Sequence, residues 1–94
     1  MVLSAAALDD LDRINAFLLE IAAESAAAVQ APILDALAIL ADHPRMGRRV
    51  EPGLRELVIS TGRTGNLALY RHDERRHLVR ILRIRHQRDA GYRD

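Results

Sequence analysis

The chain has 94 residues and is predicted to form one domain over residues 1–94. It contains no cysteine, which excludes both a disulfide framework and a thiolate metal site. No apolar run approaches the roughly 18 residues of a membrane span, and the N-terminus lacks the layout of a signal peptide, so we expect a soluble cytoplasmic protein. The net charge of +1 conceals a segregation, because residues 1–44 combine seven acids with one arginine (−6), whereas residues 45–94 combine thirteen arginines with six acids (+7).

The acidic half, residues 1–44, is predicted to be mainly a helical hairpin. Its first helix is indicated by apolar residues that recur at steps of three and four and therefore share one helix face: Leu8, Leu11, Ile14, Leu18 and Ile21. Ser4 is a suitable N-cap for this helix. Asp9, Asp10 and Asp12 lie in its early turns, where the helix dipole favours negative charge.

A second helix is predicted after residue 25. Its apolar face is formed by Val29, Ile33, Leu37 and Leu40. Pro32 allows two interpretations: it lies in the first turn of a helix that starts near Ala31, or it kinks a longer helix that starts near Ala26. We favour the longer, kinked helix. Pro44 ends it, because the residue before a proline avoids helical geometry.

The basic half, residues 45–94, is predicted to be mainly a meander of strands. Three β-rich runs, separated by the turn-forming stretches TGRTGN and DERR, are found at Leu54–Ser60, Leu67–His72 and His77–His86. Short connections make these strands antiparallel neighbours. Two helices followed by three strands predict an α+β domain with the helices on one face of the sheet.

The last of these strands, His77–His86, has a mixed pattern. With a period of two, one face carries Leu78, Arg80, Leu82, Ile84 and His86, and the other carries Val79, Ile81, Arg83 and Arg85. Neither face is purely apolar. This favours a central strand that is covered by other elements over most of its length, with arginines exposed where that cover ends. Its basic side chains would attract an acidic partner, either a nucleic acid or an acidic peptide.

Several short motifs follow one another in a characteristic order along nearly the whole chain. They are Leu40 with Pro44, Gly47 and Arg48; Leu54-Arg55-Glu56-Leu57; Tyr70-Arg71; and Ile81-Leu82-Arg83-Ile84 with His86. In this order they resemble the RelE/ParE superfamily of bacterial toxins, and most closely its ParE branch. The resemblance implies a short N-terminal strand before the hairpin. The expected fold is thus α+β, an N-terminal helical hairpin packed on a small twisted antiparallel sheet of three to four strands.

Only Met1, Val2 and Leu3 precede the predicted first helix. Members of the superfamily usually carry a fuller first strand, so the strand here is either very short or incomplete. This difference affects the edge of the expected sheet and leaves the rest of the fold unchanged.

The resemblance also implies a function. It predicts the toxin of a type II toxin–antitoxin module, of the kind used in plasmid stabilization, which arrests growth and is neutralised by a cognate antitoxin. A ParE-like toxin inhibits DNA gyrase, whereas a RelE-like toxin is a ribosome-dependent mRNA endoribonuclease. We expect the ParE-like activity, with the RelE-like enzyme and a non-toxic binding module as alternatives. No helix-turn-helix is evident, so we expect no direct sequence-specific DNA binding by this chain.

The nuclease alternative has a defined set of candidate residues. Metal-free RNA cleavage needs an acid–base group and cations for the phosphate, which His86 with Arg55 and Arg83 could supply. Arg48 is a further candidate cation, and Tyr92, distant in the tail of the chain, is a second candidate for the acid–base group. However, RelE-like enzymes typically use a lysine, and this chain has none. We therefore expect no catalytic activity, cofactor or metal, and we do not interpret His72 and His77 as a metal pair.

Structural roles are predicted for other motif residues. Pro44, Gly47 and Tyr70 belong to the shared motifs, and so do Arg48 and Arg55. These two arginines are predicted to hold the junction between helix and sheet. Their expected partners are carboxylates, namely Asp42, Glu51 or Glu56.

The end of the last strand is predicted to bind the antitoxin. Antitoxin C-terminal segments fold on binding and are often acidic and apolar, which suits a basic strand and groove. We expect such a segment to pair with Arg83, Arg85 and Arg88.

Overall fold

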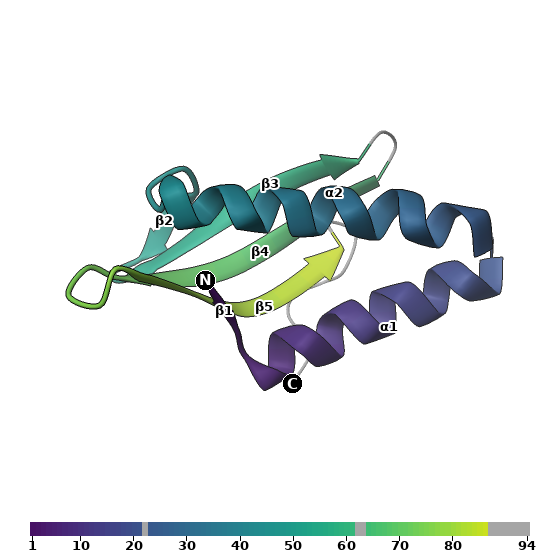
Figure 1. Ribbon diagram of the computed structural model, residues 1–94, viewed down its shortest axis with the longest axis horizontal. Helices are drawn as coiled ribbons and strands as arrows, with labels where there is room; N and C mark the ends of the chain where they lie inside the picture. The colour runs from purple at the N-terminus through teal and green to yellow at the C-terminus, as the bar shows by residue number, and fades with distance from the viewer. Residues whose placement is uncertain (22, 62–63, 87–94) are drawn as a thin grey trace.

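The computed structural model describes residues 1–21, 23–61 and 64–86, which form two helices and five strands (Figure 1). In chain order the elements are β1 (Val2–Leu3), α1 (Ala5–Ile21), α2 (Ala23–Asp42), β2 (Arg48–Glu51), β3 (Leu54–Thr61), β4 (Thr64–Asp73) and β5 (Leu78–His86). The predicted helical hairpin and the three predicted strands are all present. Neither helix, over the described residues, is both long and apolar enough to span a membrane.

Helix α1 begins at the predicted cap. The Ser4 hydroxyl oxygen accepts a hydrogen bond from the backbone N–H of Ala7 at 3.0 Å, which satisfies one of the free donors of the first turn. The core side of α1 is formed by Ala7, Leu11 and Ile14. The prediction that Leu8 belongs to this face is wrong, because Leu8 is 49% exposed and Ala7 takes the core position one residue earlier. Leu18 and Ile21 lie outside the described side chains.

Helix α2 is the longer of the two predicted alternatives. It spans Ala23–Asp42, so Pro32 lies in its interior and not in its first turn. Ile33, Leu37 and Leu40 are fully buried on its core side, as the periodicity predicts. The helix ends two residues before Pro44. The predicted kink at Pro32 stays a prediction, and Val29 lies outside the described side chains.

The sheet is larger than predicted and is mixed. Its strand order is β1-β5-β4-β3-β2, with β1 parallel to β5 and every other pair antiparallel. The expectation of three to four antiparallel strands is therefore wrong in number and in one direction. Strand β2 is missed because Arg48–Glu51 has no apolar alternation and all four of its residues are exposed, so its pairing with β3 defines it.

Strand β5 contains a β-bulge. Leu69 and Tyr70 are neighbours on β4, yet their partners on β5 are Arg83 and Ile81, which leaves Leu82 as an extra residue. The predicted alternation therefore fails beyond Ile81. The alternation predicts Ile84 on the face opposite Ile81, but the two residues pair with Ala68 and Tyr70, and both are buried on the same side.

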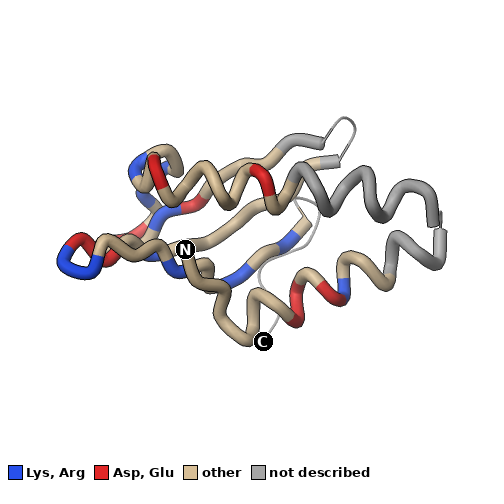
Figure 2. The backbone as a smooth tube through the Cα atoms, viewed as in Figure 1, with Lys and Arg blue, Asp and Glu red and all other residues tan. Residues whose placement is uncertain are grey.

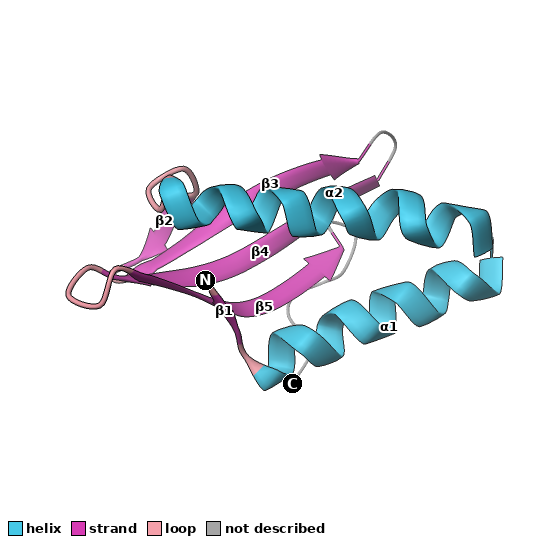
Figure 3. Cartoon of the chain, viewed as in Figure 1, coloured by secondary structure: helices cyan, strands magenta, loops and turns pink. Residues whose placement is uncertain are grey.

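Both helices lie on one face of the sheet, and the core lies between the two layers (Figures 1 and 3). The buried apolar residues of the two helices pack against buried residues of the three long strands, among them Leu57, Ala68, Tyr70, Val79, Ile81 and Ile84. Each fully buried side chain of Leu or Ile size contributes about 1.5–3 kcal/mol. The charges are also segregated in space, with acidic residues prominent on the helices and most arginines on strands and turns (Figure 2).

Candidate functional site

Asp10 of α1 is the centre of a buried polar network at the edge of β5. Its side chain is 1% exposed and its carboxylate is gripped by the Arg83 guanidinium, with Nε donating to Oδ2 at 2.9 Å and a second nitrogen to Oδ1 at 3.2 Å. The backbone N–H of Ile84 also donates to Oδ2, at 2.8 Å. Arg13 donates to Oδ1 from the next turn of the helix. Four donors from two elements therefore converge on one carboxylate.

This network satisfies the part of the β5 edge that β1 does not cover. Where β1 ends, Ser4 donates its N–H to the carbonyl of Ile81 and its hydroxyl to the carbonyl of Leu82. Asp10 then accepts the N–H of Ile84. The start of α1 thus replaces a missing strand, which keeps buried backbone groups paired and blocks further edge pairing there.

The pKa of Asp10 lies below its ordinary value. Burial strips water from the carboxylate and by itself raises this pKa. The hydrogen bonds from Arg83, the Ile84 backbone and Arg13 favour the charged form and outweigh burial. Asp10 is therefore a charged structural residue near neutral pH.

Sequence analysis identified Asp10 only as a residue of an early helical turn. A stronger signal was present, since Asp10 lies between Ala7, Leu11 and Ile14 on the apolar face of α1. A charge at such a position needs a buried partner. The sequence pattern could indicate that need, but it could not identify Arg83, which is 73 positions away.

A second network joins the end of α2 to the sheet. The hydroxyl of Tyr70, a fully buried residue of β4, donates to the carbonyl of Pro44 at 2.7 Å and accepts the N–H of Gly47 at 2.8 Å. A Cβ at Gly47 would lie 2.6 Å from the Tyr70 ring and 2.8 Å from the Glu56 carbonyl oxygen. Glycine is therefore required at this position, because a side chain would collide with the edge of the Tyr70 ring and with the β3 backbone.

The motif arginines contact this junction in different ways. Arg48 pairs with the buried carboxylate of Glu56 at 2.9 Å, and Glu56 was among the predicted carboxylate partners. Among the described residues, no carboxylate pairs with Arg55. Arg55 donates to the carbonyls of Gly47 at 2.8 Å and Arg45 at 3.4 Å.

The structure does not bring the three nuclease candidates together. Arg55 pairs with Tyr70 and Arg83 with Leu69, and adjacent residues of a strand point to opposite faces. Arg55 and Arg83 therefore start from opposite faces of the sheet. His86 pairs with Asn66, whereas Arg55 pairs with Tyr70. Asn66 and Tyr70 are four residues apart on β4, which separates the positions of His86 and Arg55 by roughly 13 Å along the strand direction.

The predicted antitoxin-binding arginines also differ in their surroundings. The Arg83 side chain is 19% exposed and engaged by Asp10. Arg85 is half-buried and donates to the carbonyl of His86 at 3.3 Å. Arg88 and the second acid–base candidate, Tyr92, lie outside the described residues.

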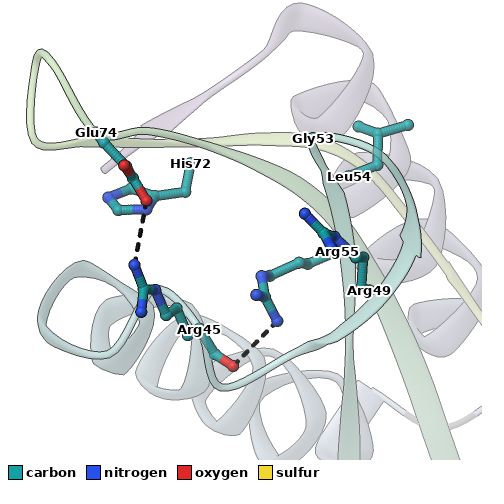
Figure 4. A pocket seen from close by; sticks show the side chains of 7 residues that line it. All are labelled: Arg45, Arg49, Gly53, Leu54, Arg55, His72 and Glu74. Atoms are coloured by element: carbon teal, nitrogen blue, oxygen red, sulfur yellow. Dashed lines mark hydrogen bonds and ion pairs between the residues drawn. The ribbon is translucent and has the colours of Figure 1, made fainter.

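An arginine-lined cavity of about 140 Å³ lies at the end of the sheet near the β2–β3 turn (Figure 4). Arg45, Arg49 and Arg55 line it together with His72 and Glu74. Sequence analysis missed this cluster because β2, which carries Arg49, was not recognised as a strand. In the described ranges no group of three or more His, Asp or Glu side chains could hold a metal ion.

Comparisons with known proteins agree with this architecture. No curated protein sequence matches the chain. A solved structure of the chromosomal ParDE toxin–antitoxin system from P. aeruginosa is similar, with 25% identity, a TM-score of 0.70, and coverage of 92% of this chain and 95% of that one. The family model of the ParE toxin of the type II toxin–antitoxin system parDE matches residues 1–91. The chain therefore belongs to the ParE toxin family of type II toxin–antitoxin systems.

Proposed function

We propose that this chain arrests bacterial growth by inhibiting DNA gyrase and is neutralised by a cognate antitoxin. The observation that carries the proposal is the match to the ParE toxin family over residues 1–91, together with the two-helix, five-strand fold. Gyrase acts on chromosomal DNA, so the proposal also assigns the protein to the cytoplasm.

The geometry favours binding over RNA cleavage. Phosphate cleavage requires cations that are aimed at one reacting phosphate beside an acid–base group. Here Arg83 is engaged by Asp10, Arg55 starts from the other face of the sheet, and His86 is remote from Arg55. This separation supports an inhibitor without catalytic residues.

The end of β5 is the proposed contact for the antitoxin, through Arg83, Arg85 and Arg88. An acidic segment arriving there would compete with Asp10 for Arg83 and meet the half-buried Arg85 beside it. Charge reversal at Arg83 and Arg85 should therefore weaken the complex. Because Arg83 also stabilises the fold, the variant Arg85→Glu alone is the cleaner test.

Asn66 lends further support to a partner at this end of the sheet. It is 1% exposed and pairs with His86, yet neither its amide nitrogen nor its amide oxygen has a hydrogen-bond partner within the described part of the chain. An unsatisfied buried amide costs about 1–3 kcal/mol. A bound antitoxin backbone that displaced the residues covering this amide, and offered it one donor and one acceptor, would recover this cost.

The decisive experiment is a supercoiling assay with purified gyrase and the toxin freed of antitoxin. Inhibition of supercoiling, or accumulation of cleaved plasmid, would support the proposal, and added antitoxin should reverse it. A folded protein that stops growth but leaves gyrase unaffected would point to the ribosome, which a messenger RNA cleavage assay tests. A folded protein that does neither would be a binding module.

A further inference from the structure

The arginine-lined cavity described above is formed by three separate segments. Arg45 comes from the loop after α2, Arg49 and Arg55 come from the paired strands β2 and β3, and His72 and Glu74 come from the end of β4 and the turn after it. Figure 4 shows Arg49 and Arg55 close together on one side and Arg45 with His72 and Glu74 on the other. The cavity thus has cationic groups on two sides.

The charge of the cavity is unbalanced. Three arginines face one carboxylate, Glu74, and that carboxylate already contacts Arg45 at 3.3 Å. Arg49 and Arg55 are directly opposite across β2 and β3, and like charges at such positions repel each other. A pair of this kind is stabilised when an anion binds between the two guanidinium groups.

Several donors in the cavity have no hydrogen-bond partner among the described residues. Arg55 is fixed by the carbonyls of Gly47 and Arg45, and both of these bonds use the same terminal nitrogen. Its other nitrogens form no hydrogen bond within the described part of the chain, and neither do the side chains of Arg49 and His72. Arg55 is therefore held in place before a ligand arrives, and Arg49 and His72 add further donors beside it.

Arg45 and Glu74 form a weak ion pair at the edge of this site. Its side chains are 77% and 70% exposed, and exposed ion pairs contribute little to stability because water screens them. Arg45 can therefore turn toward a bound anion at little cost.

We propose that this cavity binds a phosphate group. Its volume of about 140 Å³ accommodates one phosphate group, and the cavity is partly open to solvent. Donors that approach from different segments match the several oxygens of a tetrahedral anion, and arginine binds phosphate oxygens two at a time. The ligand is either free phosphate or the phosphate of an ester whose remainder projects into solvent.

The proposal is tested by titrating the full isotope-labelled chain with inorganic phosphate at constant ionic strength, with chloride as the balancing ion. Saturable NMR shifts confined to Arg49, Arg55, His72 and their neighbours are expected. Arg49→Gln should weaken binding about tenfold, because it removes one charge-assisted contact. Arg80→Gln is the matched control, since Arg80 is exposed on β5 opposite Arg71 and so lies on the other face of the sheet.

Two outcomes would overturn the proposal. One is shifts that chloride reproduces or that spread over all exposed arginines, and the other is equal weakening by Arg49→Gln and Arg80→Gln. The site-resolved shifts of the unmodified chain decide the matter even if a variant fails to fold. Titration with a nucleoside monophosphate and with a dinucleotide then identifies the source of the phosphate, and neither result depends on gyrase inhibition.

Discussion

Arg83 and the Arg49–Arg55 pair show two contrasting uses of arginine in one small sheet. Arg83 is largely buried and its charge is balanced by Asp10, so it serves the fold. Arg49 and Arg55 are opposite each other with no carboxylate partner in the described residues, so their charge is available to a ligand. The role of an arginine therefore depends on the carboxylates around it more than on its motif.

The largest predicted effect is the loss of stability when Arg83 is deprived of its partner Asp10. Asp10→Ala leaves the buried Arg83 guanidinium and the Ile84 N–H without their acceptor, and loss of one partner of a buried pair costs about 3–5 kcal/mol. Chemical denaturation of the full chain measures the free energy of unfolding. Asp9→Ala and Asp12→Ala remove the same charge from exposed positions of α1 and should each cost less than about 0.5 kcal/mol. A loss of similar size in all three variants would contradict the structural role of Asp10.

The next effect concerns the junction that positions Arg55. Tyr70→Phe keeps the buried ring but removes the hydroxyl that joins Pro44 to Gly47, leaving an N–H and a carbonyl unsatisfied. We expect a loss of about 2 kcal/mol in unfolding free energy. Wild-type stability in this variant would mean that water replaces the hydroxyl.

How far the sequence predicts the fold depends on how local each feature is. The caps and apolar periods of α1 and α2 and the runs of β3, β4 and β5 are local, and they were predicted. Strand β2 and the bulge at Leu82 are defined only by their pairing with neighbouring strands, so no local pattern indicates them. The site follows the same rule, because Asp10 meets Arg83 only through the fold.

The Asp10–Arg83 pair also predicts a pH dependence. The pKa of Asp10 is lower in the folded protein than its ordinary value of 3.8, so the folded state binds fewer protons than the unfolded state. The resulting stabilisation is fully present above pH 3.8 and is lost as the pH falls through the lowered value. Unfolding free energies measured from pH 6 downward should therefore fall more steeply for the wild-type chain than for Asp10→Asn. Parallel curves would show that another carboxylate is responsible.

The smallest predicted effect concerns the repulsion between Arg49 and Arg55. In phosphate-free buffer, Arg49→Gln removes the repulsion between Arg49 and Arg55, and relief of a like-charge cross-strand pair is expected to stabilise the free protein by about 0.2–1 kcal/mol. The gain should shrink at high salt, because exposed charges are screened. Thermal unfolding at low and high NaCl measures both effects. A destabilised variant whose loss of stability does not change with salt would show that packing of the Arg49 side chain outweighs its repulsion of Arg55.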